Sequence, residues 1–203
     1  MVLCGRSRLS AGDPASGLNR SLDTAQKRLN FDWTMPLLEP PDTHYFAAAV
    51  GWLELGNLAE AAAELAQIGP AQQDLPEVLE LRWVLCAEQK DWAAGLQAAR
   101  ALLDHAPERP SGWLHQAYAL RRVAGGSVNK AWDALLPAYD KFPKEFLISY
   151  NLACYACQMR DLETARLWLE RATSISGPKK VNQMALADPD LEALWEDIRK
   201  SRK

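Results

Sequence analysis

The sequence predicts an all-α protein, an α-solenoid of about four antiparallel helix pairs closed by a C-terminal capping helix. Three observations lead to this fold class. Apolar helical segments recur with a period near 34 residues over residues 42–179. A tight polar turn divides each block into two helices, and small residues return at the same places along the blocks. This pattern is typical of repeat proteins in which each unit buries its apolar face against the next unit.

Residues 1–41 differ from the rest of the chain. They hold five basic and four acidic residues among scattered Gly, Ser, Asn and Pro, and their apolar residues follow no helical period. We therefore expect a flexible N-terminal arm. A targeting segment is the alternative, although the apolar core of a secretory signal is missing. The apolar residues at the end of the arm are expected to fold back over the first helix: Phe31, Trp33, Met35, Leu37 and Leu38.

The repeat region divides into blocks of nearly equal length. The blocks are 42–75, 76–109, 110–145 and 146–179. Three of them have 34 residues, and the third carries two extra residues in its turn "AGGSVNKA". The turns of the other blocks read "LGNLAEA", "QKDWAAG" and "MRDLETA". The second and third blocks end at Pro107 and Pro143, where a helix cannot continue.

On these residues the chain resembles the tetratricopeptide repeat (TPR) family, over residues 42–179. The early large position of the first helix holds Tyr45, Leu79, Trp113 and Ser149, with Tyr150 beside the last. The crossing position of the first helix holds Ala49, Trp83, Ala117 and Ala153, and that of the second helix holds Ala61, Gly95, Ala131 and Ala165. Small residues there allow helices to approach closely. The second block departs from the pattern because Trp83 stands at a small-residue position.

Residues 180–203 are expected to form the capping helix. Asp188 is suited to the N-cap and Pro189 to the first helical position. An apolar stripe then follows at helical spacing: Leu191, Leu194, Trp195 and Ile198. This stripe is expected to dock onto the fourth block, whose outer face would otherwise lie open to water.

The resemblance implies a partner-binding groove formed by the first helices of successive pairs. The positions carried over from the family are Phe46, Val50, Leu53 and Glu54, then Glu77, Glu80, Val84 and Glu88, then Leu114, Tyr118, Arg121 and Arg122, and finally Tyr150, Cys154, Cys157 and Gln158. Residues 42–109 hold four basic and eleven acidic residues, a balance of −7, whereas 110–178 hold eight and six, a balance of +2. We expect a partner with basic residues at one end and an acidic group near Arg121 and Arg122. The family's clamp for chaperone C-termini is not visible, since Phe46 and Val50 occupy its places.

Cys154 and Cys157 form a Cys-x-x-Cys pair that falls inside a predicted helix. Redox pairs usually lie at a helix N-terminus, where a thiol pKa is lowered. A zinc site needs further ligands, and Cys86, His44, His105 and His115 show no paired spacing with them. We expect small packing or groove-lining residues, with a thiol or metal protein as the less favoured alternative. No catalytic residue, metal or cofactor is expected.

Composition limits the function. The net charge of −3 gives no basic field for nucleic acid, and no apolar run of about 18 residues is present to span a membrane. Four unevenly spaced cysteines favour reduced thiols and a cytoplasmic location. The sequence therefore predicts a non-enzymatic adaptor or scaffold for a protein or peptide partner. The alternative is a secretion-type chaperone that shields a client protein, and self-association is possible.

Overall fold

The computed structural model describes residues 38–200, which all belong to one unit of the chain. Every regular element in this range is helical. The pairs are α2 (Asp42–Glu54) with α3 (Leu58–Gln67), α4 (Pro76–Gln89) with α5 (Trp92–His105), α6 (Pro110–Leu120) with α7 (Val128–Lys141), and α8 (Phe146–Gln158) with α9 (Leu162–Ser176). A short 3-10 turn, η1 (Pro70–Gln72), precedes α4. The predicted all-α helix-pair fold is confirmed.

The second helix of each pair begins with the same kind of N-cap. Asn57, Asp91, Ser127 and Asp161 each accept a hydrogen bond from the backbone N–H three residues ahead. This bond satisfies one of the N–H groups that a helix start leaves without a partner. Three of the four helices that precede these caps end alike, since Gly56, Lys90 and Arg160 all have positive φ angles of 59° to 76°. The left-handed residue closes each of these helices and fixes the short turn that follows.

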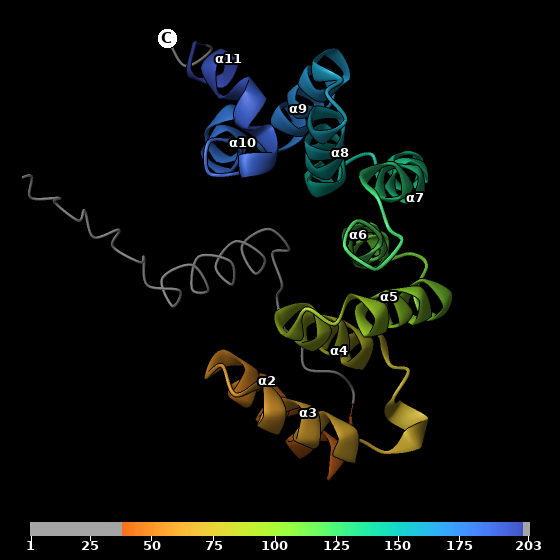
Figure 1. Cartoon of the computed structure of the whole chain (residues 1–203). Coiled ribbons are helices and arrows are strands. Elements are labelled where there is room, and N and C mark those ends of the chain that lie inside the picture. The colour runs from red at the N-terminus through yellow and green to blue at the C-terminus, as the bar shows by residue number, and fades with distance from the viewer. Residues whose placement is uncertain (1–37, 201–203) are drawn as a thin grey trace, which may run out of the picture. The chain divides into compact units, whose positions relative to one another are not determined.

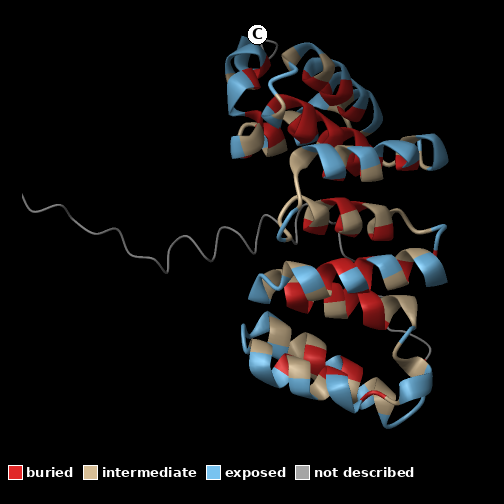
Figure 2. Cartoon of the chain, turned by 45° about the vertical axis from the view of Figure 1, so that its right-hand side comes forward, coloured by how far each residue is buried: buried red, intermediate tan, exposed pale blue. Residues whose placement is uncertain are grey.

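Neighbouring helices pack in chain order, and the first helices of successive pairs also touch one another (Figure 1). The small residues at the predicted crossing positions are all buried, and Ala61, the most exposed alanine among them, is 2% exposed. Figure 2 shows buried residues on every paired helix, most densely on α8. Burial of these stripes against the next helix is the main source of stability in such a stack.

The unexpected Trp83 packs against Gly95 of α5. A Cβ atom built on Gly95 would lie 3.8 Å from the indole nitrogen of Trp83, an ordinary contact distance, so a side chain larger than alanine would meet the ring. On its other side the Trp83 ring stacks on His115 of α6, with ring centres 3.8 Å apart and planes within 7° of parallel. The second pair therefore keeps close packing by setting the large Trp83 of its first helix against the small Gly95 of its second helix.

The C-terminal region differs from the single capping helix expected over 180–203. It consists of α10 (Pro178–Ala185), the 3-10 helix η2 (Pro189–Leu194) and α11 (Trp195–Lys200). Asp188 caps η2 by accepting from the N–H of Asp190, as predicted for its capping role. A residue before proline is disfavoured in the helical conformation, which explains the break between α10 and η2. As a result α10 packs on α9, whereas η2 turns back onto α8.

The expectations for the N-terminal arm fall almost wholly on residues 1–37, which lie outside the described range. Leu38 is described, and it is 8% exposed in a core cluster with Phe46. Among the helices of residues 38–200, none combines the length and the apolar character that a membrane span requires. The cytoplasmic location and the absence of nucleic-acid partners stay predictions.

Candidate partner-binding face

The structure places the predicted groove residues at very different depths. Six lie in the interior: Phe46, Glu80, Leu114, Tyr150, Cys154 and Cys157. Another six are partly exposed: Val50, Glu77, Glu88, Tyr118, Arg121 and Arg122. Glu54 and Gln158 are exposed. The interior residues serve the packing of the stack, so a partner can reach only part of the predicted set. The role of these residues in binding stays a prediction.

The chain's own C-terminal residues cover the part of this face that belongs to α8. We call residues 186–200 the tail. The Tyr150 hydroxyl donates to the Asp188 carboxylate at 3.0 Å, and Gln158 Nε2 donates to the backbone carbonyl of Asp190 at 3.1 Å. Leu191 and Leu194 of the tail are 0% and 1% exposed. A partner therefore has no access to Tyr150 while the tail is in place.

Arg121 holds the tail from the neighbouring α6 side. Its two terminal nitrogens pair with the two carboxylate oxygens of Asp190, with Nη2 2.8 Å from Oδ1. This hydrogen bond, together with the Asp190 charge, raises the pKa of Arg121 against the opposing effect of burial. The predicted chemistry, an acidic group on Arg121, is thus present in the structure. The acid comes from the chain itself, 69 residues away.

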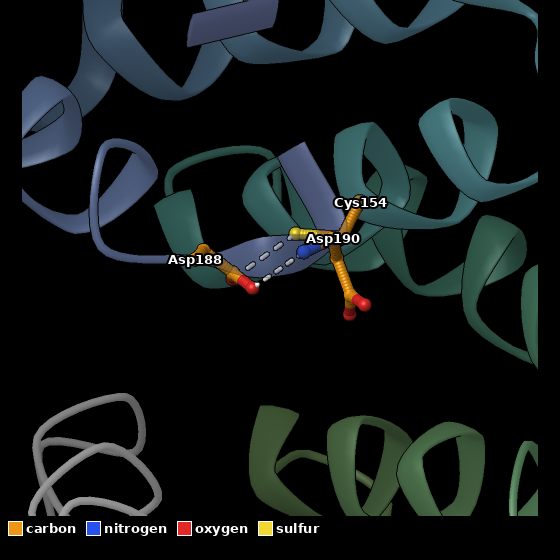
Figure 3. A group of neighbouring side chains, drawn as sticks. All are labelled: Cys154, Asp188 and Asp190. Carbon is orange, nitrogen blue, oxygen red and sulfur yellow. Dashed lines mark hydrogen bonds between the residues drawn. The ribbon is translucent and has the colours of Figure 1, made fainter. Parts of the chain in front are cut away.

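Cys154, Asp188 and Asp190 form a compact group of candidate metal ligands (Figure 3), whose donor atoms lie within 4.8 Å of one another. The residues do not fit a metal site well, because their oxygens already accept hydrogen bonds. Asp188 accepts from Tyr150, from the N–H of Asp190 and from the Cys154 thiol at 3.6 Å, and the Asp190 carboxylate is paired with Arg121. We derive no metal chemistry from this group.

The Cys-x-x-Cys thiols lie within α8, away from its N-terminus. Cys154 is 3% exposed and Cys157 is 6% exposed, and both are free of disulfides. Burial raises the pKa of the Cys157 thiol. Thiolate is the reactive form, so this environment disfavours redox or nucleophilic use of Cys157. These observations favour the packing interpretation of the pair.

The acidic residues of α4 are partly engaged within the fold. Glu77 Oε1 lies 2.6 Å from Arg109 Nη2, and Glu80 accepts from the Ser111 hydroxyl at 2.6 Å. Burial raises the pKa of Glu80, while Ser111 and Arg109 act in the opposite direction. These contacts join α4 to the start of α6. Of the predicted acidic set on α4, Glu88 makes no ion pair with another described residue.

Arg122 has surroundings unlike those of Arg121. Its guanidinium carbon lies 3.5 Å from the centre of the Tyr118 ring and 5.4 Å from that of Trp92. Nη1 donates to the backbone carbonyl of Tyr118 at 3.0 Å. The two rings come from the C-terminal part of α6 and the start of α5. Arg122 therefore lies on an aromatic surface at the junction of the second and third pairs.

Sequence reasoning missed four contributors to this face. Trp92 was not placed near Arg122, Arg109 and Ser111 were not matched to the glutamates of α4, and Asp190 was not matched to Arg121. All of these contacts join different helices and depend on the packing. The acidic "DPD" at 188–190 was the available signal for the tail, since it is complementary to the paired arginines.

Comparison with solved structures supports the fold. MamA 41-end from Desulfovibrio magneticus RS-1 is similar at a TM-score of 0.59 and 16% sequence identity, over 82% of this chain and 94% of that chain. The MamA RS-1 ArsTM double mutant is similar at 0.58 and 15%, over 81% and 85%. MamA is a TPR-like helical repeat protein, so the predicted TPR-type fold is confirmed. No family model matches the sequence, and no curated protein matches it either.

Proposed function

We propose that this protein is a non-enzymatic interaction scaffold of the TPR type, which binds a protein or peptide partner on the first helices of its pairs. The observation that carries the proposal is the position of the tail. An acidic, leucine-containing segment lies on α8 and is held by Arg121, Tyr150 and Gln158, three residues expected to face a partner. A first-helix face of this fold can therefore hold a peptide segment through side-chain contacts.

The proposed partner site lies on α4 and α6, next to the face covered by the tail. Val84 and Glu88 of α4 are partly exposed there, as are Tyr118 and Arg122 at the end of α6. The set combines apolar, aromatic and charged side chains. Interfaces of this composition obtain affinity from aromatic and arginine anchors and specificity from the charges around them.

Site-specific photo-cross-linking tests this assignment. The photoreactive amino acid p-benzoylphenylalanine replaces Val84 on α4 in one variant and Gln97, an exposed residue of the second helix α5, in a matched control. Irradiation in native cell extract is expected to give discrete cross-linked products from the Val84 variant and not from the control. Equal urea midpoints would show that both variants are folded. The same products from both positions, or no discrete product from Val84, would contradict the proposed face.

A further inference from the structure

We propose that Arg122, positioned by Tyr118 and Trp92, anchors a carboxylate of the partner, so that the bound segment is acidic. The inference rests on the proposed function, because it names the chemistry of the partner for the same face. Its evidence is the unequal use of two adjacent arginines. Asp190 of the tail pairs with Arg121. Arg122 donates to the Tyr118 carbonyl and keeps further N–H donors for a partner.

The two adjacent arginines differ in their contacts with carboxylates. Asp190 pairs with Arg121 through both of its carboxylate oxygens. No carboxylate of residues 38–200 lies within ion-pair distance of Arg122. Arg122 is thus a cation with no ion pair to a carboxylate of the described residues. An anionic group on a partner would complement this charge.

The geometry of Arg122 suits a carboxylate. The Tyr118 ring and the bond from Nη1 to the Tyr118 carbonyl hold the guanidinium in place. A guanidinium carries five N–H donors, and the rest of those on Arg122 have no acceptor among the described residues. A planar group held in this way can donate two parallel hydrogen bonds to one carboxylate. Little side-chain freedom remains to be lost on binding.

The environment strengthens such a contact. Arg122 is partly buried, and this burial lowers its pKa. The group nevertheless stays protonated at physiological pH, because an arginine pKa lies far above it. A partly desolvated cation gains more from an ion pair than a cation in open water does. The adjacent contact of Arg121 with Asp190 is a structural example of the same recognition.

Selection from a library of random 12-residue peptides displayed on phage tests the anchor. The full chain is used as wild type, as Arg122→Gln, as Arg122→Lys, and as Arg100→Gln, which removes an exposed arginine of α5 as the control. Peptides selected by the wild type are expected to be enriched in Asp or Glu. Their Kd should rise roughly 10- to 100-fold in Arg122→Gln, since charge-assisted hydrogen bonds are lost. The Kd of Arg122→Lys should lie between those of the wild type and Arg122→Gln, and the Kd of Arg100→Gln should equal that of the wild type.

The salt dependence of binding gives a readout that a purely structural role for Arg122 would not change. Wild-type affinity should fall as sodium chloride rises from 50 to 500 mM, and the fall should be weaker in Arg122→Gln. If the selected peptides lack acidic residues, or if both Arg122 variants bind them as the wild type does, the anchor is wrong and the proposed function stands. If no peptide is selected, the anchor is also wrong, and cross-linking at Val84 then decides separately whether the face binds a protein.

Discussion

The junction between α4 and α6 and the junction between α8 and the tail are both places where a first helix meets a neighbour, yet they are filled by opposite chemistry. At α4 the contact consists of stacked rings, with Trp83 against His115 and Tyr118 beside them. At α8 it consists of a buried carboxylate, Asp188, which receives several hydrogen bonds. At the aromatic junction Arg122 lies over the Tyr118 ring without an ion pair to a described carboxylate. At the polar junction Arg121 pairs with Asp190 of the tail. The comparison shows that, in the same repeat pattern, one arginine can hold a segment of the chain itself while its neighbour stays available to a partner.

The largest expected effect follows from removing the buried carboxylate of the polar junction. Asp188→Ala should lower the free energy of unfolding by about 2 to 4 kcal/mol, because the Tyr150 hydroxyl and the N–H of Asp190 both lose their acceptor inside the protein. The measurement is urea denaturation at neutral pH. The control is Asp197→Ala, which breaks an ion pair with Arg166 whose side chains are 47% and 53% exposed. That change should cost less than about 1 kcal/mol. Equal losses in the two variants would rule out a special role for the polar junction.

The aromatic junction should make stability depend on pH through His115. Burial lowers the pKa of His115 to about 3, below the value near 6.5 of an unfolded chain. The unfolded state therefore binds the proton first as the pH falls, and stability that is complete above pH 6.5 is lost progressively below it. Between pH 7 and pH 5 this group alone should cost about 1 to 2 kcal/mol. Urea midpoints across this range measure it.

The matched variants for this experiment are His115→Phe and His105→Gln. Phenylalanine keeps a ring on Trp83 but cannot take up a proton, so the pH dependence should become shallower. His105 is exposed, and replacing it should leave the slope unchanged. A slope that survives in His115→Phe would show that other groups cause it.

The smallest expected effect is that of Gly95→Ala, at the position that faces Trp83. A Cβ on Gly95 would lie 3.5 Å from Cys86 Cβ, which is an ordinary contact distance. Gly95→Ala should therefore raise stability by about 0.5 to 1 kcal/mol, since alanine favours the helical conformation and fits. Gly95→Leu should lower it by about 1 to 3 kcal/mol, because the Trp83 indole occupies the space beyond the Cβ. Thermal unfolding of both variants measures the two effects. A loss in the alanine variant would show that the helices are closer than described.

The repeat architecture could be predicted from the sequence because its signals are local. Alanines at fixed positions, such as Ala117 and Ala153, mark the helix crossings, and both are fully buried. The cap at Asp188 was likewise visible beside Pro189. Each of these features depends on residues within a few positions of one another.

The candidate site could be predicted only in part, because its contacts join distant positions. Arg109 meets Glu77 across 32 residues, and Arg121 meets Asp190 across 69. Charge balance pointed to an acidic group for Arg121 without indicating that the chain supplies it. The family resemblance also implied that Phe46 and Tyr150 lie on the binding side, although the packing of neighbouring segments buries them. A resemblance indicates the side of a helix that a residue occupies but not what covers that side.

The longer turn after α6 has a consequence for how the two arginines are directed. α6 ends at Leu120, so it has 11 residues where α4 has 14. Arg121 and Arg122 thus follow the last residue of α6, and their side chains make contacts with different parts of the chain. Arg121 pairs with Asp190 of the tail, and Arg122 lies near the Trp92 ring of the second pair. The third block therefore ends its first helix with two neighbouring cations of different use, one that holds the C-terminal segment and one that we propose for recognition.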